Sequence, residues 1–486
     1  MKTTLVWLQR ELRLQSHPAL HKALAESDKV IAVYFHDPEQ TLGDANSVWL
    51  AHSLQSLQQD LQARGGNLWM VEGEFAKEFE SLIQAYKPNQ IYYSFQVGEP
   101  ARTHQEAALD ICQKHSVVLQ PFFSEFWFDP GQIVNGQKKP YVVFTPFYKA
   151  AMKQIDRLQP IANEYGEHDA IWQKLSLTPS HPSWLKLPPS LQQLITEPWA
   201  KKVMSHWSVG ENSAWNKLED FIQNHLNDYD ENRDIPSLAA TSMLSPYLHF
   251  GEISSRAIYF EIQSRLEQGA KLVAQPWLRQ LMWREFARLL MWYFPYTESA
   301  PFQAKFEFMA WDKANIDTVA WQQGRTGIPI IDAGMRELWE TGFMHNRVRM
   351  LVASFLTKNL NQHWSEGKGW FDDTLVDADP SNNVMGWQWV AGCGVDAAPY
   401  YRLFNPVRQS ETFDPNGDYI RRWVPEISAL SKKAIHAPWE NEMECKMKGI
   451  ELGVDYPHPL VSLKQSREQH LERVAVLKEV NLQQSA

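Results

Sequence analysis

The sequence is poor in cysteine. Only three cysteines, Cys112, Cys393 and Cys445, occur in 486 residues, far apart and without a Cys-x-x-Cys pair. This pattern indicates neither a disulfide framework nor an iron–sulfur or zinc site. We therefore predict a protein that holds no metal.

Long apolar runs and targeting signals are also missing. No stretch approaches eighteen uninterrupted apolar residues, which excludes a membrane-spanning helix and predicts no membrane partner. The N-terminus, Met1 to Trp7, enters a strand-like segment directly and lacks the positive, apolar and small residues that make up a secretory signal. We expect a soluble, cytoplasmic protein.

The chain lacks a net positive charge but is rich in aromatic residues. Its net charge of -10 argues against non-specific coating of nucleic acid, because affinity for phosphate scales with the Lys and Arg brought to it; a local basic groove stays open. The 21 Trp, 23 Phe and 16 Tyr supply rigid rings that pack cores, stack bases or hold an aromatic cofactor. Core packing must account for most of them.

The first 125 residues alternate short apolar runs with longer amphipathic ones. The expected strands are Thr3 to Leu8, Val30 to Phe35, Leu68 to Val71, Ile91 to Phe95 and Val117 to Pro121. Helical patterns over Ser47 to Ala63 and Pro100 to His115 lie between them, so we predict a doubly wound, Rossmann-like parallel sheet. No G-x-G-x-x-G follows the first strand, and the usual dinucleotide fingerprint is therefore missing.

The length of 486 residues predicts two domains joined by a linker. Periodicity weakens over 126–207, where prolines gather as in a long ordered connector. Beyond it, helical spacing recurs over Ser213 to Leu226, Gln275 to Trp292 and Gly334 to Phe355. We predict an α/β domain at 1–125, a linker at 126–207 and a larger all-helical domain at 208–486.

The segment from Thr241 to Tyr247 has the features of a helix start. Small hydroxyl residues precede Pro246 at a first-turn position, and apolar periodicity follows. Helix starts bind anions readily because free N–H groups and the helix dipole point at the ligand. An ordinary N-cap is the alternative that these residues leave open.

Several segments resemble the photolyase and cryptochrome family over nearly the whole chain. The most specific are Thr241 to Gly251, Trp283 to Phe286, Gly324 to Pro329, Met344 to Met350 and Asp377 to Trp389. The resemblance implies an α/β antenna domain and a helical domain that holds FAD, active in its reduced form FADH⁻. It is closest to the pattern of cyclobutane pyrimidine dimer photolyases.

The resemblance also assigns flavin-binding residues. It places the ribityl-diphosphate portion on Tyr229 and the 241–245 segment, and an Arg349–Asp377 ion pair beside the isoalloxazine. The implied cofactor residues are Tyr229, Thr241, Ser242, Met243, Leu244, Ser245, Trp277, Gln280, Arg284, Arg349, Asp377, Ala378, Asp379 and Asn383. Read without the resemblance, Trp277 and Trp283 are as well explained as core aromatics of one helix.

Four residues are implied to take part in the photochemistry. Asn383 falls where the family faces flavin N5; plant-type cryptochromes carry Asp there, so Asn favours a repair enzyme. Trp387, Trp364 and Trp311 match a chain of oxidisable rings that carries an electron from the surface to the flavin. Sequence separation alone does not show that these rings lie close together.

The implied partner is damaged DNA with a pyrimidine dimer flipped out of the duplex. Moving the dimer out of the base stack costs a few kcal/mol, and stacking on aromatic side chains and contacts to the phosphates offset this cost. The implied DNA and lesion residues are Arg233, Trp283, Asn346, Arg347, Met350, Trp389, Arg402 and Gln409. Solvated surface charge is the alternative for the arginines.

One residue departs from the pattern. Many cyclobutane-dimer photolyases carry a glutamate where this chain has Gln280, a change shared with (6-4) photolyases and animal cryptochromes. We expect a monomeric deoxyribodipyrimidine photo-lyase; a cryptochrome photoreceptor without repair activity and a (6-4) photolyase stay open. Glu99 lies near a family position that contacts a folate, so the antenna expected is 5,10-methenyltetrahydrofolate, with a deazaflavin as the alternative.

Overall fold

The computed structural model describes residues 2–40 and 42–484, and side chains as far as 477. It contains two compact units. The first comprises the residues up to 227 with 242–295 and 376–381, and the second comprises 228–241, 296–375 and the residues from 382 onward. Because the chain passes between them several times, neither unit is one continuous segment. The domain boundaries expected at 125 and 207 stay a prediction.

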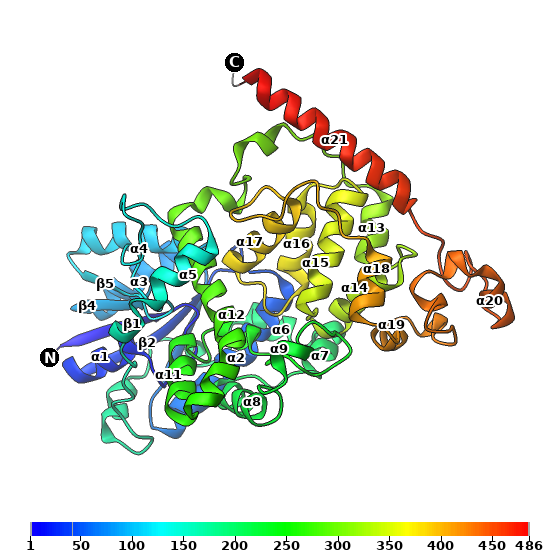
Figure 1. Cartoon of the computed structure of the whole chain (residues 1–486). Helices are drawn as coiled ribbons and strands as arrows, with labels where there is room; N and C mark the ends of the chain where they lie inside the picture. Colours follow the sequence, from blue (N-terminus) through cyan, green and yellow to red (C-terminus); the bar gives the residue numbers. More distant parts are fainter. Residues whose placement is uncertain (1, 41, 485–486) are drawn as a thin grey trace. The chain divides into compact units, whose positions relative to one another are not determined.

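A five-stranded parallel sheet forms the core of the first unit, in the order β3-β2-β1-β4-β5 (Figure 1). Its strands are β1 (Thr3–Leu8), β2 (Lys29–His36), β3 (Leu68–Glu72), β4 (Gln90–Ser94) and β5 (Val118–Phe122). Leu5 of the central strand pairs with Ile31 on one side and Ile91 on the other. The strands β1 to β4 are mostly buried, which explains their apolar runs, whereas the edge strand β5 is partly exposed.

Helices connect the strands and cover the sheet. They are α1 (Pro18–Glu26), α2 (Asp44–Ala63), α3 (Phe75–Tyr86) and α4 (Ala101–His115). The chain runs outward from β1 to β3 and then returns to β4, so right-handed crossovers place α1 and α2 on one face and α3 and α4 on the other. Trp7 of β1 packs against Phe75 and Phe79 of α3, on the face of the sheet that α3 and α4 cover.

The rest of the first unit is helical or irregular. Its elements are α5 (Phe144–Met152), η1 (Ile155–Arg157), η2 (Ala170–Leu175), η3 (Pro182–Leu185), α6 (Pro189–Leu194), α7 (Pro198–Met204), α8 (Glu211–Asn224), α10 (Ser245–His249), α11 (Ser255–Arg265) and α12 (Gln268–Tyr293). Buried residues follow the length of α12 from Ala274 to Met291, so this helix is a central element.

The second unit is built from helices in the described part of the chain. Its elements are α9 (Tyr229–Asn232), η4 (Pro295–Glu298, entered from the first unit), η5 (Ala304–Phe308), α13 (Ile316–Gln322), α14 (Pro329–Thr341), α15 (Asn346–Ser354), η6 (Phe355–Asn359), α16 (Trp364–Thr374), α17 (Pro380–Ala391, which begins in the first unit), α18 (Pro406–Phe413), α19 (Asp418–Trp423), η7 (Pro425–Ile427), η8 (Ala434–His436), η9 (Pro438–Glu440), α20 (Glu442–Met447) and α21 (Leu463–Gln484). Helix α14 packs against α13, α15, α18 and α19. Helix α15 continues into η6, a π-helical turn.

The predicted fold class is confirmed: an α/β part with a parallel sheet and a larger helical part. The first and last residues of each predicted strand lie within one residue of those observed. The helical pattern expected over 334–355 is divided into α14 and α15. Gly342 ends α14 with φ +68, a left-handed conformation that glycine adopts without strain, and His345 then caps α15.

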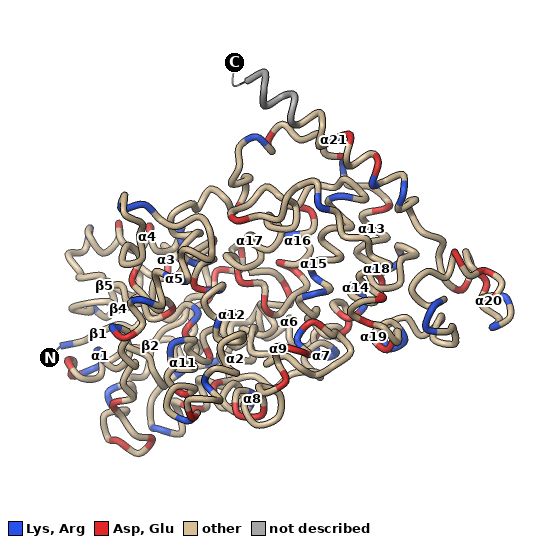
Figure 2. The backbone as a smooth tube through the Cα atoms, viewed as in Figure 1, with Lys and Arg blue, Asp and Glu red and all other residues tan. Residues whose placement is uncertain are grey.

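No helix in the described residues is long and apolar enough to cross a membrane. Lys and Arg are interspersed with Asp and Glu along the elements of each unit (Figure 2). The most unusual charges are not on the surface. A buried group in the first unit joins Arg13 Nη1 to Glu125 Oε1 at 2.8 Å and Arg284 Nη2 to Glu125 Oε2 at 3.4 Å.

Replacing Glu125 tests how far the first unit depends on this group. Glu125→Gln leaves two buried guanidinium groups without their shared counter-charge, so we expect a loss of about 3 to 5 kcal/mol in the free energy of unfolding. Urea denaturation measures it. The matched control is Glu99→Gln, in the exposed pair with Arg102, for which we expect less than about 1 kcal/mol. Equal effects would contradict the prediction.

The same variant has a pH signature. Burial acts to raise the pKa of Glu125, but the charges of Arg13, Arg284 and Arg288 outweigh it and hold the pKa below the ordinary 4.5. The carboxylate therefore stabilises the fold above pH 4.5 and loses this effect as the pH falls through the lower folded value. Glu125→Gln should flatten the acid side of the stability profile.

Candidate functional site

The residues singled out by sequence are divided between the units. The first unit holds Ser242, Met243, Leu244, Ser245, Trp277, Gln280, Trp283, Arg284, Asp377, Ala378 and Asp379. The second holds Tyr229, Arg233, Thr241, Trp311, Asn346, Arg347, Arg349, Met350, Trp364, Asn383, Trp387, Trp389, Arg402 and Gln409. The roles assigned to all of them, including the Arg349–Asp377 pair, remain predictions.

In the first unit, the 242–245 segment leads into helix α10. Met243 has a positive φ of 52°, which is uncommon for a residue with a side chain. Helix α10 starts with Pro246 in its first turn, and no side chain caps its N-terminus. Pro246 has no backbone N–H, so the N–H groups of Ser245 and Tyr247 are those that no capping side chain uses in this turn.

A buried carboxylate, Asp379, lies among three cationic or ionisable groups of the first unit. Its Oδ2 atom is 3.5 Å from Arg10 Nη1, 3.5 Å from Arg288 Nη1 and 3.8 Å from His249 Nδ1. Burial alone would raise the pKa of Asp379, but the nearby His249 imidazole and the charges of Arg288 and Arg10 hold the pKa well below its ordinary value. Asp379 is therefore a fixed negative charge at neutral pH.

Three further observations concern helix α12. Arg284 donates to Leu248 O (2.9 Å) as well as pairing with Glu125, so its guanidinium belongs to the buried charge group. Trp277 packs on Phe221 with ring centres 4.8 Å apart. The Gln280 amide donates to Pro276 O at 3.3 Å, within its own helix.

Trp283, a predicted wall of the lesion pocket, is stacked on a second aromatic ring. The rings of Trp283 and Phe144 of α5 are parallel within 7° with centres 3.5 Å apart, and Arg279 lies 5.2 Å from the Phe144 ring centre. Phe144 therefore covers one face of the indole, and the Phe286 ring lies edge-on to it with ring centres 6.0 Å apart. Sequence reasoning did not identify Phe144.

Some buried polar atoms lack a partner, and they test whether the site fits a cofactor. In the first unit these include His249 Nε2, Ser381 Oγ and Arg288 Nε; in the second, Trp387 Nε1 is in the same state. Buried polar groups are normally hydrogen-bonded, so unpaired ones near predicted flavin residues are what a ligand rich in polar groups would satisfy. The residues present fit FAD.

In the second unit, Asn383 is held by helix α16. Its Nδ2 donates to Asp372 Oδ1 (2.6 Å) and to Lys368 O (3.2 Å). Among the described residues, its Oδ1 accepts no hydrogen bond. The amide is neutral and rigidly held, with its oxygen available.

The predicted electron relay lies entirely in the second unit. Trp387 is buried and packs against Phe371 and Trp321, with ring centres 5.0 and 6.2 Å apart. Trp364 is also buried and begins α16, whereas Trp311 is half-exposed. In the described part of the chain no direct ring contact joins Trp311 to Trp364 or Trp364 to Trp387.

Helix α15 carries the predicted lesion-side residues. Asn346 is exposed at its first turn, and Arg349 Nε donates to Met344 O at 2.7 Å. Arg347 pairs with Asp234 at 2.7 Å and lies over the Phe413 ring. The guanidinium also approaches Met350 Sδ at 3.9 Å.

The other predicted residues of the second unit lie on separate elements. Tyr229 is buried at the start of α9 with the Arg233 guanidinium 5.7 Å from its ring centre. The exposed Arg402 lies just before α18, which carries the half-buried Gln409. A buried lysine, Lys358, donates to Arg402 O at 2.6 Å. Trp389 is half-buried on α17, and Thr241 is half-buried.

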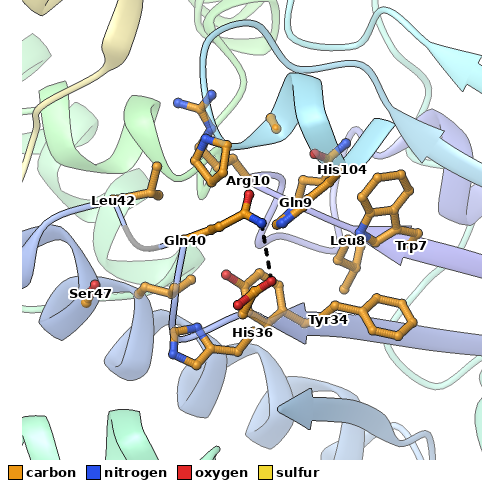
Figure 3. A pocket seen from close by; sticks show the side chains of 15 residues that line it. Trp7, Leu8, Gln9, Arg10, Tyr34, His36, Gln40, Leu42, Ser47 and His104 are labelled. Atoms are coloured by element: carbon orange, nitrogen blue, oxygen red, sulfur yellow. Dashed lines mark hydrogen bonds between the residues drawn. The ribbon is translucent and has the colours of Figure 1, made fainter. Parts of the chain in front are cut away.

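The first unit also has a pocket at the carboxyl edge of its sheet (Figure 3). It has a volume of about 570 Å³ with its open mouth, and it is lined by the ends of β1 and β2 and the starts of α2 and α4. Gln40 lies at its centre and donates to Asp37 at 3.5 Å. His104 lines it with a buried Nε2 atom that has no partner. Ligands of doubly wound sheets bind at such edges.

Comparison with known proteins agrees with this geometry. Residues 4–164 match the family described as DNA photolyase, and residues 277–476 match the FAD binding domain of DNA photolyase. A deoxyribodipyrimidine photo-lyase from Agrobacterium fabrum is 37% identical over 98% of both chains. The chain belongs to the DNA photolyase and cryptochrome family. It therefore carries the family's FAD-binding domain, and the family acts on damaged DNA.

Solved structures of the family include both kinds of member. A class III photolyase from Agrobacterium tumefaciens is 34% identical with a TM-score of 0.85, covering 99% of this chain and 98% of that one. A cryptochrome from Synechocystis sp. is 30% identical with a TM-score of 0.87, covering 97% and 99%. Fold likeness alone thus does not separate repair from signalling in this photolyase-family chain.

Sequence reasoning missed the residues that hold the site in place. Arg10, Arg13, Glu125 and Arg288 are buried charges, and Phe144 supports Trp283. The available signal was Arg10 and Arg13 directly after an apolar strand, where two arginines need buried carboxylates to be stable.

Gly367 gives a direct test of how Trp387 is held. A Cβ atom at this position of α16 would meet Trp387 Cη2 at 2.0 Å. Gly367→Ala should therefore displace the indole and destabilise the fold by about 1 to 3 kcal/mol, measured by urea unfolding, with a changed near-ultraviolet circular dichroism spectrum.

The control lies on the same helix. Gly369 has nothing within 4 Å of the added atom, so Gly369→Ala should leave Trp387 in place and stabilise the helix by up to about 1 kcal/mol. If both alanine variants behaved alike, the packing of Trp387 on Gly367 would not be what holds the indole.

Proposed function

We propose that this protein repairs cyclobutane pyrimidine dimers in DNA by light-driven electron transfer from bound, reduced FAD. The single observation that carries the proposal is Asn383, a neutral amide held by Asp372 and Lys368 O. By resemblance it faces flavin N5, where plant-type cryptochromes carry a carboxylate. When bound and excited by blue light, FADH⁻ would supply the electron that splits the ring bonds of the dimer and would regain it afterwards.

The residues of the chain have distinct parts in this proposal. The 242–245 segment and the start of α10 would hold the diphosphate, and Asp379 would present a fixed charge to the polar part of the cofactor. Arg10, Arg288 and His249 act through Asp379 and are positioning residues. Asn383 lends a neutral oxygen beside the ring, so it does not add a negative charge to an already reduced cofactor.

By resemblance to the family, Trp283 and Trp389 would each stack on the flipped lesion. Each stacked base contributes about 1 to 3 kcal/mol, which offsets the cost of leaving the duplex. Asn346 and Met350 lie four residues apart on one face of α15 and contact the dimer. Arg233, Arg347, Arg402 and Gln409 bind the flanking phosphates, and the protein acts as a monomer.

Two alternatives share the same cofactor. A cryptochrome photoreceptor would photoreduce its flavin without repairing DNA, and the Synechocystis relative is named a cryptochrome. A (6-4) photolyase is favoured by Gln280 but disfavoured by Met350, where those enzymes bring a second histidine. Asn383 and Met350 together favour cyclobutane-dimer repair.

We also propose that a second pigment binds as a light-collecting antenna. The pocket of Figure 3 is an open-mouthed hollow at the edge of the sheet, and the unpaired His104 Nε2 would meet a polar group there. Pro100 lines it, and the neighbouring Glu99 pairs with Arg102. A 5,10-methenyltetrahydrofolate is the pigment proposed, with a deazaflavin as the alternative outcome of extracting and identifying the chromophore.

The decisive experiment is repair by the flavin-reduced protein under anaerobic light. Oligonucleotides carrying either a cyclobutane thymine dimer or a (6-4) product are assayed for restored thymines, with dark samples as controls. We expect light-dependent repair of the cyclobutane substrate alone. Repair of the (6-4) product alone would assign that activity instead, and no repair by yellow, photoreducible protein would assign a photoreceptor.

The relay has its own test. Trp387→Phe should slow light-driven reduction of the oxidised flavin by about tenfold or more, because it removes the first oxidisable ring. Repair by protein that has been reduced chemically should change little, since that reaction does not use the relay. Equal loss of both activities would overturn the assignment of Trp387.

A further inference from the structure

A histidine lies between the outer two tryptophans of the predicted relay. The His363 ring meets Trp311 edge to face with ring centres 5.4 Å apart, and it meets Trp364 at 5.3 Å. Among the described residues, Trp311 and Trp364 each make a ring contact with His363 and with no other aromatic ring, so the two indoles do not contact each other. The imidazole is thus the packed bridge from the half-exposed Trp311 to the buried Trp364.

The hydrogen bonds of His363 define its protonation state. The ring is the N-cap of α16: its Nδ1 accepts the backbone N–H of Ser365 at 3.2 Å and lies 2.6 Å from Ser365 Oγ. A backbone N–H can only donate, so Nδ1 carries no proton and the neutral ring is protonated at Nε2. Protonating Nδ1 would remove the cap and place a positive charge at a helix N-terminus, where the dipole opposes it.

The charges around the ring act in both directions. Burial lowers the pKa of His363 below its ordinary 6.5, and Glu366 in the first turn of α16 acts to raise it. On the segment that supplies Trp311, the backbone of Asp312 forms a β-bridge with Gln362, but Glu366 is the carboxylate that acts on the pKa of His363. The net result is a neutral ring at neutral pH.

We propose that His363 is a positioning residue of the electron relay, which holds Trp311 and Trp364 on either side of one neutral ring so that a positive charge can move outward between the two indoles. The proposal rests on the proposed function, since it needs a flavin that takes electrons from the chain. Its geometry, however, belongs to the second unit alone.

The electron transfers balance without any contribution from the histidine. Trp364 gives one electron to oxidised Trp387, Trp311 gives one electron to oxidised Trp364, and an added thiol reductant restores Trp311. His363 gains and loses none. Protonated imidazole would repel the positive charge that passes between the indoles, so the transfer should slow when the ring is charged.

The test uses His363→Asn, which keeps an N-cap side chain but removes the ring. Asparagine is among the best N-caps, so we expect unchanged thermal unfolding of α16 and of the whole protein. At pH 8 with added thiol, the initial rate of light-driven flavin reduction should fall by about tenfold. This corresponds to an increase of about 1.4 kcal/mol in the activation barrier.

The pH profile supplies a readout that a purely structural role would not move. The wild-type rate should fall as the pH drops below 6.5, and this step should be absent from His363→Asn. Nitrogen-15 histidine spectra give a measurement independent of the flavin: one imidazole with its proton on Nε2 should be missing from the variant. His17→Asn is the matched control, because His17 also caps a helix with its side chain but lies outside the relay.

The outcomes separate the two proposals. Equal rates for wild-type and His363→Asn at all pH values would overturn the role of His363, even if Trp311→Phe slowed reduction as expected. A similar loss in His17→Asn would assign the effect to stability instead. If the wild-type flavin were not photoreducible at all, the proposed function would fail, while the tautomer seen in the spectra would still report on His363.

Discussion

Burying charge at the start of the chain is the constraint on which much of the first unit depends. Arg10 and Arg13 follow β1 directly and are almost fully buried, so each must meet a carboxylate inside the protein. Arg13 meets Glu125, and Arg10 meets Asp379, 369 residues away in sequence. Helix α12 adds Arg284 and Arg288 to the same two carboxylates.

This arrangement links the sheet edge with the predicted flavin segment. Arg10 lines the pocket at the end of β1 and also contacts Asp379, and its Nη2 atom donates to Val97 O at 2.9 Å. Gly251 is part of the same contact: it has φ +62, and a Cβ there would meet Arg10 O at 2.0 Å. The loop after β1 and the turn after α10 are therefore packed too closely for larger residues.

The second unit relies on a different kind of order. Its predicted photochemical residues are neutral, and they are held by packing and by hydrogen bonds such as those of the Asn383 amide. Helix α16 begins with Trp364, and one turn later its Gly367 packs against Trp387. Lys368 O and the Asp372 carboxylate of the same helix accept hydrogen bonds from the Asn383 amide. One short helix thus positions two rings and one amide, with His363 at its start.

The sequence by itself determined the local elements and the family. Apolar runs such as Leu5 to Leu8, within the strand expected at Thr3 to Leu8, predicted buried parallel strands, because burial on both faces favours apolar residues at successive positions. Motifs such as Asp377 to Trp389 predicted the family, which the comparisons confirm. The Gly334 to Phe355 pattern was less decisive, since periodicity does not show where a left-handed glycine ends a helix.

Only the tertiary structure decided which residues meet. Three contacts depend on how separate segments pack. They are the pairing of Arg10 with Asp379, the stacking of Phe144 on Trp283, and the position of His363 between Trp311 and Trp364. Periodicity reports which face of one element is apolar, whereas a contact between elements depends on how both are oriented in three dimensions. For this reason the identities of the site residues could be read from the sequence, but the groups that hold them could not.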